Sequence, residues 1–300
     1  MSQSINSLKK FGKSFYWAGM ILPDYYLKRS ADLYYLCRKL DDIADDNRSK
    51  KTLSKLNLIK DLIIEGNYDK LKEIGIRVPT FLQNKLYARK AILDLLDGLI
   101  FDQGNVRIKN IDELLTYCYR VAGTVGVMMC VSLDCNEKKA LEFAIDLGIG
   151  MQLTNIIRDV LEDAQLNRRY LPSSMNCNFI PSKIISISLK KKINNHEDKL
   201  IRNSLSDLLL ISEEYYKSGK QGLYFLPFKI RISIAVATNL YREIGIKIKN
   251  NSFNWYKGRQ YTSIFSKIKV TALTMIIELI KFKRSCPTHN KKLHNPFKDI

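Results

Sequence analysis

Residues 37–46 read CRKLDDIADD and residues 152–163 read QLTNIIRDVLED, and both are acidic stretches within segments of helical periodicity. Each stretch places aspartates four residues apart, Asp41 with Asp45 and Asp159 with Asp163. In a helix this spacing puts both carboxylates on one face, where like charges repel by about 0.2–0.5 kcal/mol. Apolar residues surround both pairs, so neither pair is expected on a fully solvated face. A bound cation would offset the repulsion.

Polar side chains extend the second stretch, because Gln152 and Asn155 precede Asp159 on nearly the same line of the helix. Oxygen ligands without histidine or cysteine suit a hard cation such as Mg²⁺, which completes its coordination shell with water and substrate phosphates. Two facing helices of this kind would hold several Mg²⁺ ions around one diphosphate. The arginines that would bind its oxygens are Arg38, Arg158 and Arg168.

A purely structural explanation competes with the metal site. A single pair of aspartates on a helix is most often a solvated face, but two pairs with adjacent arginines in apolar helices are harder to explain in this way. Neither stretch has the alternating loop ligands and central glycine of an EF-hand. The chain also lacks the glycine-rich phosphate loop of nucleotide triphosphatases.

Apolar residues recur every three or four positions along almost the whole chain, which predicts helices. The sequence therefore predicts one all-α domain of about ten helices in residues 1–284, followed by a basic, loose tail in residues 285–300. The predicted helices span residues 25–46, 85–101, 111–133, 138–164, 181–189, 200–217, 227–249 and 255–283.

Composition limits the class of protein. Among 300 residues, 46% are hydrophobic and 26% charged, which excludes a disordered chain. The net charge of +19 is compatible with nucleic acid, anionic lipid or a phosphorylated substrate, but the basic residues are scattered, so we expect no nucleic-acid partner. The six cysteines form no CxxC pair, and no apolar run reaches the roughly 18 residues that span a bilayer. We expect a cytoplasmic protein.

Together these motifs resemble the squalene/phytoene synthase family. The first signature is carried by Ser14-Phe15, Tyr34, Cys37-Arg38 and residues 41–45, and the second by residues 152–163 with residues 167–172 (NRRYLP). Between them, residues 117–129 read YCYRVAGTVGVMM, which is similar to the middle helix of the family. The match is looser after residue 226, and in all it covers roughly residues 11 to 270.

The resemblance implies a single-domain isoprenoid-synthase helical bundle around a central hydrophobic cavity. It also implies a Mg²⁺-dependent prenyltransferase, with Mn²⁺ as an alternative ion. The middle helix and second signature look closest to bacterial phytoene synthases, which join two geranylgeranyl diphosphates head to head through a cyclopropyl diphosphate. The product of that reaction is 15-cis-phytoene, at the first committed step of carotenoid synthesis, and no NADPH is expected.

The resemblance also assigns roles to residues of this chain. The expected metal ligands are Asp41, Asp45, Asn155, Asp159 and Asp163. The four aspartates are expected to be catalytic, together with Arg38, Arg158, Tyr34, Tyr117 and Tyr241. The expected substrate-binding residues are Ser14, Phe15, Val121, Gly126, Gln152, Asn155, Arg168 and Tyr170. For the tyrosines and for Gly126, ordinary helix packing remains an alternative.

Other functions remain open. One is a squalene or dehydrosqualene synthase that uses farnesyl diphosphate, and another is a non-catalytic assembly factor of the same fold. Small residues at Gly19 and Ala31, if they line the cavity, favour the longer C20 substrate. Residues 255–284 form an expected basic amphipathic helix, so peripheral contact with the inner face of the membrane is a further alternative. Contacts with other isoprenoid enzymes are also left open.

Overall fold

The computed structural model describes residues 2–46, 49–189, 196–280 and 285–300. These residues form fifteen α-helices and no β-strand, apart from one isolated bridge between Arg107 and Arg169. The prediction of an all-α fold is confirmed. The sequence pattern predicted too few helices because it missed the short ones and α4 (Lys50–Glu65).

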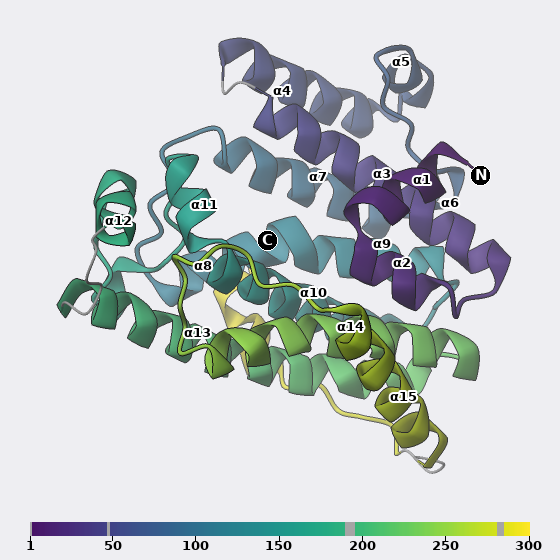
Figure 1. The fold of residues 1–300 in the computed structure, drawn as a ribbon. Coiled ribbons are helices and arrows are strands. Elements are labelled where there is room, and N and C mark those ends of the chain that lie inside the picture. The colour runs from purple at the N-terminus through teal and green to yellow at the C-terminus, as the bar shows by residue number, and fades with distance from the viewer. Residues whose placement is uncertain (1, 47–48, 190–195, 281–284) are drawn as a thin grey trace.

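The N-terminal third of the chain forms one layer of the molecule, at the top of Figure 1. Its three longest helices, α3, α4 and α7, pack against one another. In α3 the buried residues Leu33, Leu36 and Leu40 follow the three- and four-residue spacing of a helix face. The helices of this part of the chain are α1 (Gln3–Phe11), α2 (Lys13–Gly19), which packs mainly on α14 (Phe228–Asn250), α3 (Asp24–Asp45), α4 (Lys50–Glu65), α5 (Tyr68–Glu73), α6 (Thr80–Gln83) and α7 (Leu86–Phe101).

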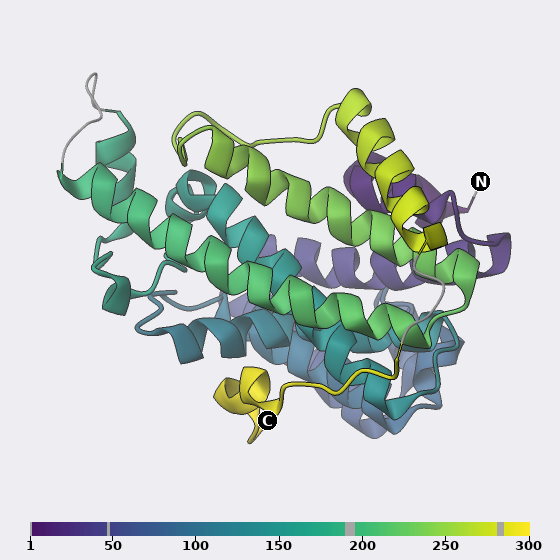
Figure 2. The same ribbon diagram turned by 90° about the horizontal axis from the view of Figure 1, so that it is seen from below.

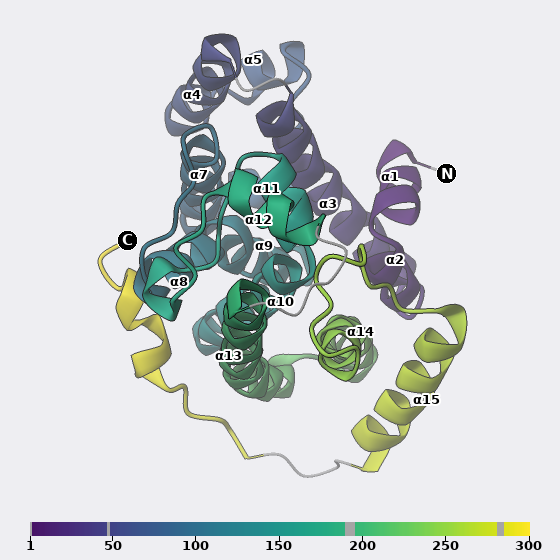
Figure 3. The same cartoon turned by 60° about the vertical axis from the view of Figure 1, so that its left-hand side comes forward.

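The rest of the chain is organised around α10 (Lys138–Arg158), which packs against α9, α13 and α14 (Figure 3). Glycines allow its close approach to the preceding segment: a Cβ atom on Gly126 would lie 2.1 Å from the Ala144 carbonyl oxygen. The remaining elements are α8 (Ile111–Cys118), the π-helical η1 (Tyr119–Gly123), α9 (Thr124–Ser132), α11 (Val160–Gln165), η2 (Ser173–Met175), α12 (Pro181–Ser188), α13 (His196–Gly219), η3 (Lys220–Phe225), α14 (Phe228–Asn250), α15 (Ile264–Ile280) and η4 (Lys291–Phe297).

Two predicted helices differ from the structure. The helix expected over residues 138–164 is interrupted at Asp159, so α11 begins at Val160. The helix expected from residue 255 begins only at Ile264, because Ser252, Phe253 and Gly258 have positive φ angles that end the preceding helix and form a loop. Trp255 is buried in this loop, and its Nε1 donates to Asp198 at 2.9 Å. The last predicted residues, 281–284, lie outside the described residues.

The C-terminal segment also differs from the expected loose tail. Residues 285–300 run along the outside of the bundle, and η4 packs on α8 (Figure 2). Phe297 is buried and stacks on Tyr119, with ring centroids 4.7 Å apart. The missing periodicity was misleading because this segment is held by individual anchoring side chains rather than by an amphipathic helix face.

Two helical stretches in the described part of the chain, Ile111–Ser132 and Lys138–Arg158, are long and apolar enough to cross a membrane. In both, 56% of the most apolar window is buried inside the protein. Core helices of a folded domain have the same property, so these stretches are weak indications of a membrane span.

Candidate functional site

A cavity of about 1000 Å³ runs through the bundle between α2, α3, α9, α10 and α14. This volume lies at the upper end of the about 300–1,000 Å³ that is usual for small-molecule sites. Most of its wall is apolar, with contributions from Leu33, Leu95, Val125 and Met129. The charged side chains in its wall include Arg38, Asp41, Asp102, Arg158, Asp159 and Arg259. The cavity therefore suits a molecule with a long apolar part and an anionic group.

The carboxylates of α3 lie on one side of this charged region. Asp41 lines the cavity, and its Oδ2 lies 3.9 Å from Nη1 of Arg38. Arg38 also forms an ion pair of 2.7 Å with Asp42. Desolvation raises the pKa of Asp41 to about 6, and the negative charge of Asp45 adds to the effect. Asp41 is thus a carboxylate whose charge lacks full compensation from protein groups.

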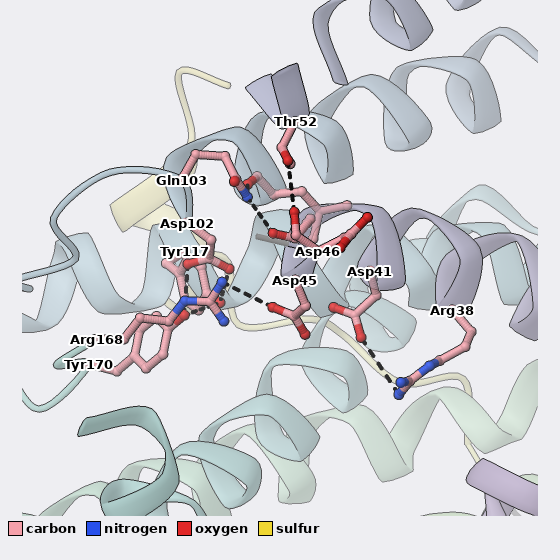
Figure 4. Close-up of polar contacts among 12 residues, drawn as sticks. Arg38, Asp41, Asp45, Asp46, Thr52, Asp102, Gln103, Tyr117, Arg168 and Tyr170 are labelled. Carbon is pink, nitrogen blue, oxygen red and sulfur yellow. Dashed lines mark hydrogen bonds and ion pairs between the residues drawn. The ribbon is translucent and has the colours of Figure 1, made fainter. Parts of the chain in front are cut away.

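Asp102 is a buried carboxylate that the sequence analysis did not identify. Its two oxygens accept hydrogen bonds from the hydroxyls of Tyr117, at 2.9 Å, and Tyr170, at 2.7 Å. Arg168 crosses from the loop after α11 to Asp45, at 3.1 Å, and lies beside this cluster (Figure 4). Burial raises the pKa of Asp102, although Arg168 and the two hydroxyls oppose the shift. Tyr117 and Tyr170, predicted from the sequence, are therefore linked through Asp102.

The side chain of Gln103 links the end of α7 to the end of α3. Gln103 Nε2 donates to the carbonyl oxygens of Ala44, at 2.9 Å, and Leu99, at 3.2 Å. This places Asp102 next to the acidic end of α3. No local pattern marks Asp102 in the sequence, because it is one aspartate just after an apolar helix and its partners are distant along the chain.

On the opposite side, the carboxylate of Asp159 lies between two arginines. Arg158 binds it at 2.7 and 2.6 Å, and Arg259 binds it at 2.9 Å through both Nε and Nη2. Burial alone would raise the pKa of Asp159, but the hydrogen bonds from both arginines outweigh it and hold the pKa below its usual range. Arg259 was not predicted, because the sequence pattern placed it inside a helix that the structure replaces with a loop.

Asp163 differs from Asp159, although it lies one turn later. Desolvation and the charge of Asp159 raise the pKa of Asp163 well above its usual range, with partial compensation from Arg168. Asp102 raises the pKa of Asp41 and of Asp163 by its charge, and Asp45 raises that of Asp102. The two acidic stretches thus converge on Asp102.

The chemistry of these donors fits a divalent cation. Desolvation, with an added contribution from neighbouring carboxylates, raises the pKa of Asp41 and Asp163. Asn155 Oδ1 is buried in the cavity wall without a hydrogen-bond partner among the described residues. Carboxylate and amide oxygens are the ligands that Mg²⁺ prefers. Asp159 is the exception, because its oxygens are already occupied by two arginines, one of which would have to move.

Aromatic residues line the cavity near Arg38. Phe15 stacks on Tyr241, with centroids 4.8 Å apart, and lies 6.5 Å from the ring of Tyr34. Burial raises the pKa of Tyr34 to about 12 and also raises that of Tyr241, so both hydroxyls keep their protons. The predicted residues Ser14, Val121, Gly126 and Gln152 also line the cavity.

Not every predicted residue reaches the cavity. Asp45, Asp163, Arg168 and Tyr170 are absent from its wall, although Arg168 pairs with Asp45 and Tyr170 donates to the wall residue Asp102. Gly19 lines the cavity, whereas Ala31 is fully buried and does not line it. Of the two residues expected to set substrate length, only Gly19 has the required position. Gly126 lines the cavity and also makes the close helix contact, so its position agrees with both interpretations.

The chain is similar in sequence to known proteins. A family model described as squalene/phytoene synthase matches residues 8–272. The chain is 32% identical to a 15-cis-phytoene synthase of Enterobacter agglomerans over 270 residues, which cover 85% of this chain and 88% of that protein. It is 29% identical to a phytoene synthase of Pseudescherichia vulneris over 282 residues, 89% of this chain and 88% of that protein.

Solved structures show the same fold. A dehydrosqualene synthase in complex with a ligand superimposes with a TM-score of 0.75 at 23% identity, covering 91% of this chain and 94% of that one. A squalene synthase from Alicyclobacillus acidocaldarius superimposes with a TM-score of 0.66 at 15% identity, covering 84% and 95%.

Proposed function

The chain belongs to the squalene/phytoene synthase family, and we propose that it condenses two geranylgeranyl diphosphates into 15-cis-phytoene. It is a prenyltransferase. The proposal for the product is supported by the relatives named phytoene synthase, which match along most of their length. The observation that carries it is the convergence of two acidic stretches on the charged region of a long apolar cavity.

The family uses a divalent metal, and we propose Mg²⁺, with Mn²⁺ as a substitute. The residues that would hold it are Asp41, Asp45, Asn155, Asp159 and Asp163. Bound there, the ion would supply a Lewis acid that neutralises the departing diphosphate. Arg38 and Arg158 line the cavity next to these carboxylates and would bind diphosphate oxygens. Arg168, which pairs with Asp45 outside the cavity wall, is a further candidate.

The apolar wall has a separate role. It would hold both prenyl chains and exclude water, so that the allylic cation reacts with the double bond of the second substrate rather than with water. The cleaved C–O bond would leave its electron pair on the diphosphate, and the double bond of the second substrate would form a first C–C bond to the allylic cation, which leaves a tertiary cation. Loss of a proton from the former allylic cation carbon would supply the electron pair of a second C–C bond, which closes the cyclopropane ring. A second ionisation, rearrangement and proton loss would then give the triene. Tyr34 and Tyr241, both protonated, are placed to orient a diphosphate by donating hydrogen bonds.

The second candidate function is a squalene-type synthase acting on farnesyl diphosphate. The glycine at position 19 favours the longer substrate, because a side chain there would project into the cavity wall beside Leu27. A non-catalytic role is disfavoured by the intact set of four aspartates.

We further propose that α15 rests on an anionic membrane surface at the inner face of the membrane. Its apolar side chains are largely exposed, with Phe265 at 81% and Ile280 at 75%. Lys267 and Lys269 lie on the same helix, and Lys267 with Tyr261 also lines the cavity. Exposed apolar area of this extent beside basic residues is typical of an interfacial helix. The cavity would then open next to the membrane that dissolves its substrate and product.

One experiment tests the main proposal. The purified protein is incubated with Mg²⁺ and either geranylgeranyl or farnesyl diphosphate, with and without NADPH, and the hydrocarbon is identified by mass spectrometry. We expect phytoene from the C20 substrate without NADPH, and no product from Asp41→Ala or Asp159→Ala variants that keep their helical circular dichroism. Squalene as the main product, or substantial activity in either variant, would contradict the proposal.

A further inference from the structure

Outside the cavity, three side chains converge on the far side of α10. Asp146 is fully buried, and its two oxygens each lie 2.9 Å from a histidine Nε2, Oδ2 from His289 and Oδ1 from His294. The three ligand atoms all lie within 4.8 Å of one another. The chain contains only three histidines, and two of them meet at this carboxylate. We propose that Asp146, His289 and His294 form a binding site for one Zn²⁺ ion, which fastens the C-terminal segment to α10.

The donor set supports zinc rather than magnesium. Two imidazole nitrogens and one carboxylate are ligands of first-row transition metals, whereas Mg²⁺ prefers oxygen ligands alone. Tetrahedral ligands at about 2.0–2.1 Å from Zn²⁺ are about 3.3 Å apart. The two observed Nε2–oxygen separations of 2.9 Å, each to a different oxygen of Asp146, would need to widen by a few tenths of an ångström. The remaining ligand separations, which are at most 4.8 Å, would need to reach the same value, with the imidazole protons on Nδ1.

The surroundings also suit a metal site. Ser218 of α13 donates to Asp146 Oδ2 at 2.5 Å, which orients the carboxylate. The ring of Phe143 meets His289 edge-on at 5.2 Å, and that of Phe297 lies 4.9 Å from His294, so apolar groups surround the polar atoms. The side chain of His294 is 18% exposed, which leaves a route for the ion and a position for water as a fourth ligand. Oriented ligands in an apolar shell are typical of bound metals.

The site is separate from the cavity but shares its wall. Asp146 does not line the cavity, whereas its neighbours Leu147 and Gly148 do. The same C-terminal segment is tied to two other elements: Tyr215 donates to the Leu293 carbonyl at 2.7 Å, and Thr116 to that of Pro296 at 2.9 Å. A metal ion at Asp146 would thus fix the segment across α8, α10 and α13, behind the helices that shape the cavity.

The test measures metal binding without substrate, so its outcome does not depend on the proposed enzyme activity. Chelator-treated protein is titrated with Zn²⁺ against a chromogenic competitor in excess Mg²⁺, and with Co²⁺ followed by visible absorbance. We expect one equivalent of Zn²⁺, a Co²⁺ spectrum without thiolate charge-transfer bands, and a higher unfolding temperature with Zn²⁺. The His289→Ala and His294→Ala variants should lose this equivalent.

Matched variants separate the site from other ligands. His196→Ala removes the third histidine, which is exposed at the start of α13, and should bind Zn²⁺ like the wild type. Ser218→Ala should weaken Zn²⁺ binding by about 10–100-fold, as expected for loss of an orienting hydrogen bond to a ligand. If the wild-type protein binds no Zn²⁺ in excess Mg²⁺, or if the Co²⁺ spectrum shows thiolate ligands, the site is a hydrogen-bonded cluster only and the proposal is wrong. The wild-type titration decides this even if a histidine variant fails to fold.

Discussion

Replacing Asp102 by asparagine tests whether the buried cluster behind the cavity serves the reaction or only the fold. The change removes one negative charge beside Arg168 and turns two charge-assisted hydrogen bonds from Tyr117 and Tyr170 into neutral ones. Hydrogen bonds to charged groups contribute about 1.5–3 kcal/mol, roughly twice as much as neutral ones. Part of this loss is recovered because the neutral amide is cheaper to bury. We expect a decrease of about 1–3 kcal/mol in the free energy of unfolding.

The effect on turnover should be larger than the effect on stability suggests. Without its charge, the side chain at position 102 orients Tyr117 more weakly and no longer balances Arg168, which itself binds Asp45. A misplacement of about 1 Å at such a site costs on the order of 100-fold in rate. We therefore expect kcat to fall by about 10–100-fold. Urea unfolding and steady-state rates of hydrocarbon formation measure the two effects.

Asp94 provides the matched control, because it is a buried carboxylate on α7 that also accepts a tyrosine hydroxyl, that of Tyr119 at 2.9 Å. It does not line the cavity. Asp94→Asn should lower stability by a similar amount and leave kcat within about twofold of the wild type. If Asp102→Asn behaves like Asp94→Asn, with stability reduced and kcat unchanged, the cluster is structural and our interpretation of Asp102 is refuted.

Three other predictions concern the cavity and its surroundings. Gly19→Phe should shift the ratio of kcat/KM values for the two substrates toward farnesyl diphosphate by at least about 10-fold. Ala31→Trp, at a fully buried position, should lower stability without shifting this ratio. Equal ratios in Gly19→Phe and wild type would contradict this prediction. Below about pH 6, protons should compete with Mg²⁺ for Asp41, so initial rates should show an acid limb that moves to lower pH as Mg²⁺ is raised; a limb independent of Mg²⁺ would exclude Asp41 as a ligand. Phe265→Asp should weaken co-sedimentation with anionic vesicles, unlike the control Leu210→Asp on α13; unchanged binding would remove α15 from the interface.

The pH prediction has a second part, because the stability of the protein should depend on pH in opposite directions without and with Mg²⁺. In the metal-free protein the pKa of Asp41 is raised from 3.8 to about 6, so the folded state binds more protons than the unfolded chain in this window. The contribution of Asp41 to stability therefore falls as pH rises through the window. With Mg²⁺ bound to the ionised form, the dependence should reverse. Thermal unfolding at several pH values, with and without Mg²⁺, distinguishes the two cases.

Apart from α4, the sequence predicted the long helices because their evidence is local. Spacing of Leu33, Leu36 and Leu40 is enough to predict α3, and the fold class follows from many such segments. The acidic pairs were also visible, because residues four apart on a helix necessarily share a face. This local information did not predict where the helices are interrupted. The end of α10 at Asp159 and the loop around Trp255 depend on backbone angles and burial that are set by distant segments.

The parts of the site that could not be predicted are those in which charged side chains from distant parts of the sequence interact in the folded structure. Asp102 and Arg259 are single charged residues without a motif, and each acquires its role only when α7 meets α3 or when the loop before α15 reaches Asp159. Asp159 and Asp163 show the consequence: they are equivalent in sequence spacing, yet two arginines lower the pKa of the first, while burial raises that of the second. A carboxylate that is already paired with guanidinium groups binds a metal cation less strongly than a carboxylate whose negative charge is not compensated. The motif therefore predicts which residues can bind metal, whereas their neighbours in space decide the order in which they would do so.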